Sequence, residues 1–280
     1  TTMATSLAAF YFNLPVCHVE AGLRTNNINS PFPEELNRQI VSRISSIHFA
    51  PTEKAKINLL NENVPNEKIC ITGNTVIDSL FSIVQKAREV NYPNYLLAEL
   101  PFLLEKVNDK SRIILVTGHR RENFGRGFED ICNALKDIAL IYPNDRIIYP
   151  VHLNPNVQDP VNRILSNVEN IHLIEPLDYL TFVKLMDSSY LIITDSGGIQ
   201  EEAPSLGKPV LVTRKVSERE EAIIAGTVIL VGTDRQKIFM EVQKLLENKN
   251  TYNDMSIIHN PYGDGMASKR ISSYLKGFLQ

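Results

Sequence analysis

Side chains that could transfer protons or bind phosphate follow five short runs of aliphatic and β-branched residues. The first such residue after each run is Glu20, His119, His152, Asp195 or Arg214. Carboxylates and imidazoles act as acids and bases, and guanidinium groups bind phosphate oxygens in a forked geometry. Ligands of open α/β sheets bind beyond the carboxyl ends of the strands. The pattern therefore favours a ligand site along one rim, between two domains.

The turn Ser196-Gly197-Gly198 joins a predicted buried strand directly to a predicted helix. Glycine lets the backbone approach a ligand closely, and a helix N-terminus offers unpaired N–H groups with a partial positive charge. This arrangement suits a diphosphate. The alternative is that Asp195 or Ser196 caps the helix and that the glycines only permit a tight turn.

Glu201 and Glu202 lie one turn into the same helix. A carboxylate there could accept hydrogen bonds from ribose hydroxyls, or it could simply complement the helix dipole. The segment lacks the six-residue dinucleotide fingerprint and the later acidic residue that a nicotinamide ribose requires. No nicotinamide cofactor is therefore expected.

The residues around His119 leave their roles open. His119 could donate to a phosphate or carry a proton near neutral pH, and it could equally cap a strand end. Arg120 and Arg121 could bind phosphate or remain solvated. A buried hydrogen-bonding role is favoured for His152 over contact with substrate.

Glu20 and Glu34 are carboxylates with more than one possible role. Glu20 stands four residues before Arg24, which fits a simple ion pair. Glu34 and Glu35 follow the rigid segment Ser30-Pro-Phe-Pro33 and begin a predicted helix, where acidic residues are usual. Carboxylates in a partly dry cleft can share acid and base duties, although spacing alone does not select that role. No residue set has metal-ligand spacing, and no Gly-x-Ser-x-Gly elbow occurs, so a metal site and a serine hydrolase are disfavoured.

Composition narrows the class of protein. The 280 residues include 29 Lys plus Arg and 32 Asp plus Glu, so the net charge of −3 gives no broad positive field for nucleic acid or anionic lipid. With 43% hydrophobic residues the chain can bury a sizeable core, but its apolar runs are too short to cross a bilayer. Three widely spaced cysteines and the absence of a leader-like start indicate a cytoplasmic protein. The net charge and the short apolar runs indicate that it has neither nucleic-acid nor membrane partners.

Alternating strands and helices must position these residues. The predicted strands are Leu14–Val19, Ser46–Ala50, Lys68–Thr72, Arg112–Thr117, Arg146–Val151, Asn170–Ile174, Tyr190–Thr194, Pro209–Thr213 and Thr227–Val231. Apolar residues recur at helical spacing in Ala4–Phe12, Phe128–Ile141, Tyr179–Asp187 and Ala267–Phe278. Strands separated by helices imply right-handed crossovers and parallel sheets, so the predicted fold class is α/β.

The segment Asn91–Lys110 has the composition of a connection, and Thr72-Gly73-Asn74 ends a strand with turn residues. The domain boundary is expected between these two segments, nearer Thr72-Gly73-Asn74. Only three predicted strands precede it, which is few for a doubly wound domain. The first domain is therefore expected to be incomplete.

Six motifs, in this order, resemble those of the non-hydrolysing UDP-N-acetylglucosamine 2-epimerase family. They are His18-Val-Glu-Ala-Gly-Leu-Arg-Thr25, Pro31-Phe-Pro-Glu-Glu-Leu-Asn-Arg38, Thr72-Gly-Asn-Thr-Val-Ile-Asp78, Thr117-Gly-His-Arg-Arg-Glu-Asn123, Tyr149-Pro-Val-His-Leu-Asn-Pro-Asn156 and Thr194-Asp-Ser-Gly-Gly-Ile-Gln-Glu-Glu-Ala-Pro-Ser-Leu-Gly-Lys-Pro209. The match spans essentially the whole chain, and motifs of this length in one order are specific.

The resemblance implies two Rossmann-like domains of GT-B type with the site in the cleft between them. Residues 1–73 would form a partial N-terminal domain with the catalytic carboxylates. Residues 74–264 would form the C-terminal UDP-binding domain, and residues 265–280 a helix that returns to the first domain.

The resemblance also implies an isomerase that interconverts UDP-N-acetylglucosamine and UDP-N-acetylmannosamine. UDP would be eliminated to leave a 2-acetamidoglucal and then added back, without cofactor or metal, in a homodimer that supplies polysaccharide biosynthesis. The implied catalytic residues are Glu20, Glu34 and His119. The implied UDP contacts are His119, Leu177, Phe182, Ser196, Gly197, Gly198, Glu202 and Arg219.

The chain departs from the family pattern in two places. Two family loops, of Gly-Thr-Arg-Pro-Glu and Gly-Asp-Thr type, would lie upstream of Thr1, and the second carries a third catalytic carboxylate. Ser217-Glu-Arg-Glu220 lacks the usual proline after Arg219. The alternatives are a catalytically impaired UDP-sugar-binding fragment or a hydrolysing epimerase that releases UDP and N-acetylmannosamine. The Glu20 and Glu34 motifs disfavour a GT-B glycosyltransferase.

Overall fold

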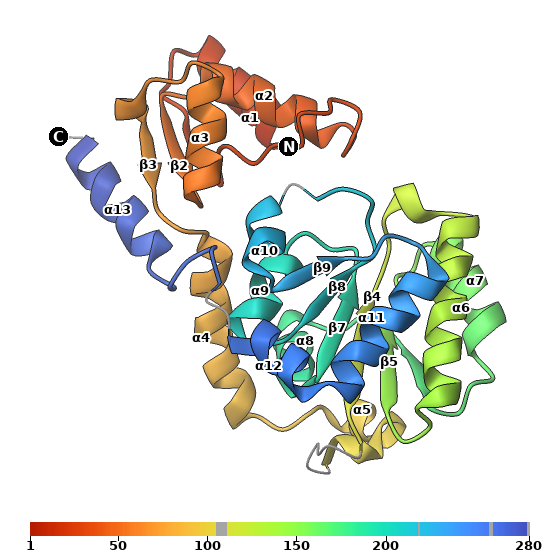
Figure 1. Cartoon of the computed structure of the whole chain (residues 1–280). Coiled ribbons are helices and arrows are strands. Elements are labelled where there is room, and N and C mark those ends of the chain that lie inside the picture. The colour runs from red at the N-terminus through yellow and green to blue at the C-terminus, as the bar shows by residue number, and fades with distance from the viewer. Residues whose placement is uncertain (105–110, 218, 258–259, 279–280) are drawn as a thin grey trace. The chain divides into compact units, whose positions relative to one another are not determined.

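The computed structural model describes residues 1–104, 111–217, 219–257 and 260–278. They divide into two compact units. The first comprises Thr1–Phe81, Glu218–Glu221 and Pro261–Gln280, and the second comprises Ser82–Ser217 and Ala222–Asn260. Each unit contains its own parallel sheet covered by helices (Figure 1).

The first unit has the strand order β1-β2-β3. Its elements are α1 Thr2–Tyr11, β1 Cys17–Val19, α2 Glu34–Ile44, β2 Ile47–Ala50, α3 Glu53–Asn61, η1 Asn66–Lys68, β3 Ile69–Ile71, the start of α4 Thr75–Glu89, and α13 Ala267–Phe278. Side chains of β2 alternate between two small cores, as a strand requires. Phe49 packs edge-on against Tyr274 of α13, with ring centroids 5.4 Å apart, whereas Ala50 packs with Leu59 of α3.

The turn after β1 is held tightly against α3. Gly22 has φ +88°, and a Cβ atom added there would lie 2.1 Å from the backbone oxygen of Ala55. Only glycine combines this dihedral angle with so close an approach. The turn that follows Glu20 is therefore fixed by the fold of the first unit.

The second unit is a doubly wound sheet with the order β6-β5-β4-β7-β8-β9. Its strands are β4 Ile113–Thr117, β5 Arg146–Pro150, β6 Ile171–Ile174, β7 Leu191–Thr194, β8 Val210–Val212 and β9 Val228–Leu230. Its helices are the remainder of α4, α5 Asn94–Glu99, η2 Pro101–Leu104, η3 Arg121–Asn123, α6 Arg126–Ile141, α7 Pro155–Leu165, α8 Tyr179–Ser188, α9 Ile199–Ser205, α10 Glu220–Ala225 (which begins in the first unit), α11 Arg235–Glu247 and α12 Lys249–Ile257.

The strand order of this sheet reverses between β4 and β7. Helices α6, α7 and α11 cover one face of the sheet, and α8 and α9 cover the other (Figure 1). Thr117 and Thr194 are register partners at the carboxyl ends of these two strands. The residues that follow them are consequently brought together at the topological switch point, where ligands of doubly wound sheets bind.

The structure confirms all nine predicted strands within the described residues, each shortened by up to three residues at its ends. The predicted helix Ala267–Phe278 has the observed bounds, and the other three predicted helices agree to within two residues. The prediction that Asn91–Lys110 is only a connection is wrong for its first part, which contains α5 and η2. Residues 105–110 lie outside the described residues.

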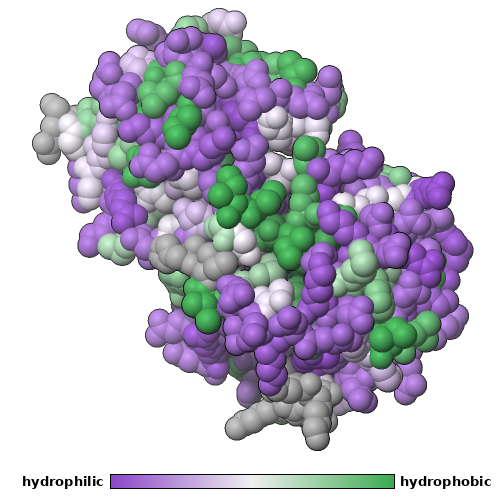
Figure 2. All heavy atoms as spheres, in the orientation of Figure 1, coloured by the Kyte–Doolittle hydropathy of each residue, from purple (hydrophilic) through white to green (hydrophobic). Residues whose placement is uncertain are grey.

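The predicted domain boundaries at 73/74 and 264/265 stay predictions, whereas the compact units divide after Phe81 and before Pro261. In the described residues no helix is long and apolar enough to cross a membrane. The face shown in Figure 2 is mostly hydrophilic, with separate hydrophobic patches.

Candidate active site

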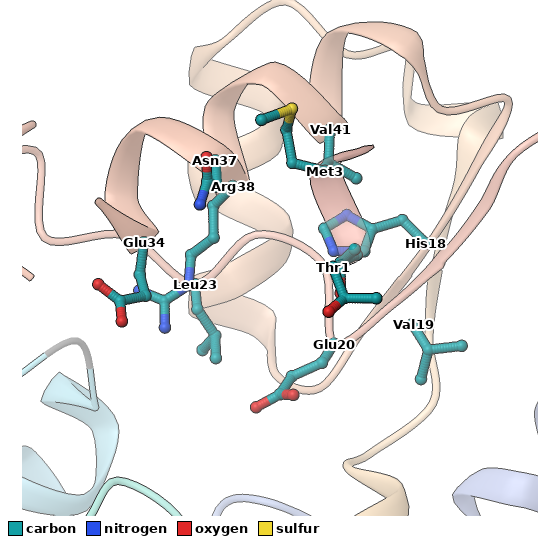
Figure 3. A pocket seen from close by; sticks show the side chains of 11 residues that line it. Thr1, Met3, His18, Val19, Glu20, Leu23, Glu34, Asn37, Arg38 and Val41 are labelled. Atoms are coloured by element: carbon teal, nitrogen blue, oxygen red, sulfur yellow. The ribbon is translucent and has the colours of Figure 1, made fainter. Parts of the chain in front are cut away.

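In the first unit, Glu20 and Glu34 line one pocket. The pocket has a volume of about 310 Å³, and its lining includes His18, Leu23 and Arg38 (Figure 3). Glu20 follows β1, and Glu34 is the first residue of α2. The elements on which these two residues stand therefore bring both predicted carboxylates to the same cavity.

The carboxylate of Glu20 is partly exposed and has two polar neighbours among the described residues. Asn74 donates to Glu20 Oε1 at 3.4 Å, and Arg219 Nη2 lies 3.6 Å from the same oxygen. The alternative of an ion pair between Glu20 and Arg24 is wrong. Arg24 is buried and makes a forked contact with Glu62 instead, with N···O distances of 2.6 and 3.0 Å.

Glu34 and Glu35, although adjacent, have opposite surroundings. Glu35 is completely buried, and its carboxylate accepts hydrogen bonds from the backbone N–H groups of Thr25 and Asn26 at 3.1 and 3.3 Å. Gln39 donates to it at 3.1 Å. Glu35 therefore holds the loop after Arg24 in place, and Glu34 is the carboxylate of the pair that is exposed at the pocket.

His18 lines the same pocket, although it was predicted only as part of a motif and not as a site residue. Burial, reinforced by His48 on the neighbouring strand, lowers the pKa of His18 to about 4. Nδ1 of His18 has no hydrogen-bond partner among the described residues. A neutral imidazole is thus present beside Glu20. Its position in a strand directly before a candidate catalytic residue was the available sequence signal.

In the second unit, the loop after β4 is fastened to the end of β7. Asp195 Oδ2 accepts from the backbone N–H groups of His119 and Arg120 at 2.9 and 2.8 Å. Asn123 donates to the same oxygen at 3.5 Å and to the backbone oxygen of Thr213 at 2.9 Å. A Cβ atom at Gly118 would lie 3.0 Å from the hydroxyl of Tyr149, so a larger residue would fit only if the buried Tyr149 side chain shifted.

His119 projects from this loop with an exposed side chain. Its ring stacks on His152, with centroids 5.3 Å apart and planes 18° apart, and its Nδ1 lies 3.6 Å from Asp195 Oδ1. Partial burial lowers the pKa of His119; Asp195 opposes this effect, whereas Arg120 and His152 add to it. His152, for which a buried hydrogen-bonding role was predicted, is exposed, and its Nδ1 accepts from the N–H of Asn154 at 3.1 Å.

The turn Ser196-Gly197-Gly198 follows β7 and leads into α9. Gly198 occupies the N-cap position, and no side chain caps the helix, so the alternative of a cap by Asp195 or Ser196 is wrong. Gly198 has φ −61° and ψ −43°, dihedral angles that any residue adopts, and a Cβ atom there would meet nothing within 4 Å. The fold itself does not require glycine at this position, so the backbone is left open to a ligand.

Glu202 of α9 accepts a hydrogen bond from the hydroxyl of Tyr179 at the start of α8. Burial raises the pKa of Glu202, and the hydrogen bond from Tyr179 acts in the opposite direction. Leu177 and Phe182, two of the predicted UDP contacts, flank this N-terminus of α8 and are half-buried. Tyr179 was not predicted as a site residue. The only feature of the sequence that could have indicated it is its position between Leu177 and Phe182.

The two arginines near the end of β8 are separated by the fold. Arg214 is fully buried, and its Nε donates to Glu122 at 2.9 Å, which places it in the support of the His119 loop. Arg219 belongs to the first unit and lies beside Glu20. Among the described residues, no three His, Cys, Asp or Glu side chains are grouped so that they could hold a metal ion.

A doubly wound sheet with a glycine turn at its switch point, together with a second α/β unit that carries a carboxylate pocket, is typical of α/β proteins that bind nucleotides. The model of the family described as UDP-N-acetylglucosamine 2-epimerase matches residues 1–276. The chain belongs to this family, as its sequence motifs predicted.

Relatives named UDP-N-acetylglucosamine 2-epimerase are similar along nearly the whole chain. The protein of Salmonella typhimurium is 58% identical over 279 residues, which cover 99% of this chain and 73% of the relative. The protein of Escherichia coli (strain K12) is 57% identical over 277 residues, with the same coverage of 99% and 73%.

Solved structures of the family share the fold. The Neisseria meningitidis UDP-GlcNAc 2-epimerase bound to UDP-GlcNAc has a TM-score of 0.91 and 49% identity, covering 98% of this chain and 73% of that one. The S. aureus MnaA–UDP structure has a TM-score of 0.91 and 43% identity, covering 99% and 73%. These matches confirm the predicted α/β, GT-B-like fold class.

Proposed function

We propose that this chain catalyses the reversible C2 epimerisation of UDP-N-acetylglucosamine to UDP-N-acetylmannosamine. One observation carries the proposal: Glu20 and Glu34, which stand in the two carboxylate motifs of a family to which the chain belongs, line a single pocket. The Salmonella typhimurium relative named UDP-N-acetylglucosamine 2-epimerase is 58% identical to this chain.

In the proposed reaction, Glu20 and Glu34 are the acid and base at C2 of the sugar. A base removes the C2 proton while the bond between C1 and the UDP oxygen breaks, which leaves a 2-acetamidoglucal and UDP. The UDP oxygen then adds back to C1, and the other face of C2 is protonated. Proton transfer between positioned groups contributes about 10²–10⁴-fold to such a step. The reaction has no net oxidation, so no cofactor or metal is proposed.

The second unit is proposed to hold the nucleotide. The breaking bond leaves negative charge on UDP, which a cation and unpaired N–H groups stabilise. His119 and the turn Ser196-Gly197-Gly198 would contact the diphosphate. The further proposed contacts are Glu202 to ribose, Leu177 and Phe182 to uracil, and Arg219, from the first unit, to the nucleotide.

The two alternatives make different products. A hydrolysing epimerase would release UDP and N-acetylmannosamine, and a binding fragment would hold UDP without turnover. The family match gives no support to either over the epimerase. A homodimer, a cytoplasmic location and a role in polysaccharide biosynthesis remain predictions from the sequence.

The test is incubation of the chain with UDP-N-acetylglucosamine in D₂O, followed by proton NMR. Loss of the C2 proton signal together with signals of UDP-N-acetylmannosamine is expected. Glu20→Gln should abolish exchange, whereas Glu53→Gln, on the exposed start of α3, serves as the matched control. Stoichiometric free UDP would favour hydrolysis. Saturable UDP binding without exchange would overturn the proposal.

A further inference from the structure

We propose that Asp195 is a positioning residue for His119: it anchors the His119 loop with one carboxylate oxygen and directs the other to the imidazole Nδ1. The inference deepens the proposed function, because it rests on His119 as the group that contacts the diphosphate. It assigns a role to an aspartate that was predicted only as a possible helix cap.

The first part of this role is carried by Asp195 Oδ2. Asp195 is 0% exposed, and this oxygen accepts the backbone N–H groups of His119 and Arg120 at 2.9 and 2.8 Å. Two strong acceptor contacts to consecutive amides fix the path of the backbone. The carboxyl end of β7 thereby sets where the loop after β4 carries its histidine.

The second part is carried by Asp195 Oδ1. This oxygen is buried and has no hydrogen-bond partner among the described residues, and it lies 3.6 Å from His119 Nδ1. A buried carboxylate oxygen without a donor is costly, so a donor nearby is strongly favoured. The 3.6 Å separation is too long for a hydrogen bond, and a small rotation of the His119 side chain would close it.

The consequence is a defined imidazole tautomer. An acceptor at Nδ1 selects the form with hydrogen on Nδ1 and leaves Nε2 directed away from Asp195. When His119 is protonated, the same carboxylate stabilises the cation, and Nε2–H becomes a donor for a phosphate oxygen. Arg120 and His152 are the other charged or titratable groups that act on this ring, and both oppose the cation. Asp195 is therefore the group that favours it.

The substitution Asp195→Asn separates the two parts of the role. Two backbone N–H groups require the amide oxygen as their acceptor, so the loop contact is kept. The amide NH₂ group then faces His119, and Nδ1 must become an acceptor. In ¹⁵N-histidine NMR, the neutral His119 ring is expected to change from the Nδ1–H to the Nε2–H tautomer, and its pKa is expected to fall by about one unit or more. Loss of the signal in His119→Gln assigns it.

The wild-type spectrum tests the inference even if Asp195→Asn does not fold. A neutral His119 with hydrogen on Nε2 in the wild-type protein would overturn it. An unchanged tautomer and pKa in a folded Asp195→Asn protein would do the same. A merely structural role predicts loss of thermal stability without any change of tautomer.

Binding of UDP distinguishes this inference from the proposed function. Asp195→Asn is expected to weaken UDP binding about tenfold at pH 6, and to have no further effect in a His119→Gln background. If the wild-type protein does not bind UDP at all, the proposed function fails, while the tautomer experiment still decides the role of Asp195.

Discussion

Arg219 Nη2 lies 3.6 Å from Glu20 Oε1, with the arginine side chain 7% exposed and the glutamate side chain 44% exposed. The two residues are far apart in the sequence and were predicted for different tasks, one for the nucleotide and one for acid/base chemistry. Their proximity within the first unit means that a guanidinium sits at the edge of the carboxylate pocket. A single substitution of Arg219 is therefore expected to affect the chemical step as well as binding.

Arg219→Ala is expected to lower kcat/KM for UDP-N-acetylglucosamine at least about tenfold, or about 1.4 kcal/mol of transition-state stabilisation. The reason is the loss of a buried cation beside Glu20 and, in the proposed binding mode, of its contact with the nucleotide. Lys54→Ala is the matched control, because Lys54 pairs with Glu220 at 3.2 Å in the same unit but is well exposed. Equal kcat/KM for wild type and Arg219→Ala would contradict the prediction.

Glu35→Ala is expected to destabilise the chain by about 1–3 kcal/mol, because it removes a fully buried carboxylate that accepts from the backbone N–H groups of Thr25 and Asn26. Glu34→Ala is the neighbouring control and should change the free energy of unfolding by less than about 0.5 kcal/mol, since Glu34 is exposed. Urea unfolding of both proteins measures the difference. A larger loss in Glu34→Ala would reverse the assigned roles.

Stability should fall between pH 6.5 and pH 4 because of two histidines, His48, which is buried, and His18, which is half-buried. Burial lowers the pKa of both His18 and His48 from 6.5 to about 4. In this window the unfolded chain binds protons that the folded chain does not, so acid favours unfolding. The expected loss is on the order of 1–2 kcal/mol per histidine at pH 5.

The comparison of unfolding free energies at pH 7 and pH 5 should therefore show a smaller difference in His48→Gln than in wild type. The difference between the two pH values is the relevant quantity, because the substitution also changes stability at both. An identical pH dependence in His48→Gln would show that His48 is not buried as a neutral group.

Glu202→Ala is expected to weaken UDP binding about tenfold, which corresponds to about 1.4 kcal/mol. If its carboxylate accepts from ribose hydroxyls, 2′,3′-dideoxy-UDP should bind wild type and Glu202→Ala with the same affinity. Glu129→Ala is a surface control, since Glu129 pairs with Arg163 on an exposed face. A tenfold loss for the dideoxy compound as well would assign Glu202 to support of α8 through Tyr179 rather than to ribose.

The sequence predicted the sheets better than it predicted the partners of polar side chains. Runs such as Leu191–Thr194 are apolar, β-branched and short, and only a buried parallel strand suits them. The segment with Asn94–Glu99 was missed as a helix because it is brief and follows proline, which usually marks a connection.

The roles of Asp195, Glu35 and Arg24 could not be derived from local pattern. Each was open to a nearby interpretation: a helix cap, a first-turn acid and an ion pair with Glu20. In the structure, Asp195 accepts from Arg120, Glu35 accepts from Thr25, and Arg24 donates to Glu62. These partners come into contact only once the chain has folded. Sequence spacing reports neighbours along a helix or strand, and these contacts join separate elements.

Gly22 and Gly198 would behave differently in a library of random variants. Substitution of Gly22 brings a side chain against the backbone of Ala55, so a screen for folded protein alone would already reject it. Gly198 has helical dihedral angles, and a Cβ atom there would meet only open space, so the same screen would accept other residues at this position. A screen for growth that depends on the enzyme would retain both. At residue 198 the two screens would then differ in the substitutions that they tolerate. That difference would indicate that glycine is needed there for ligand binding and not for folding.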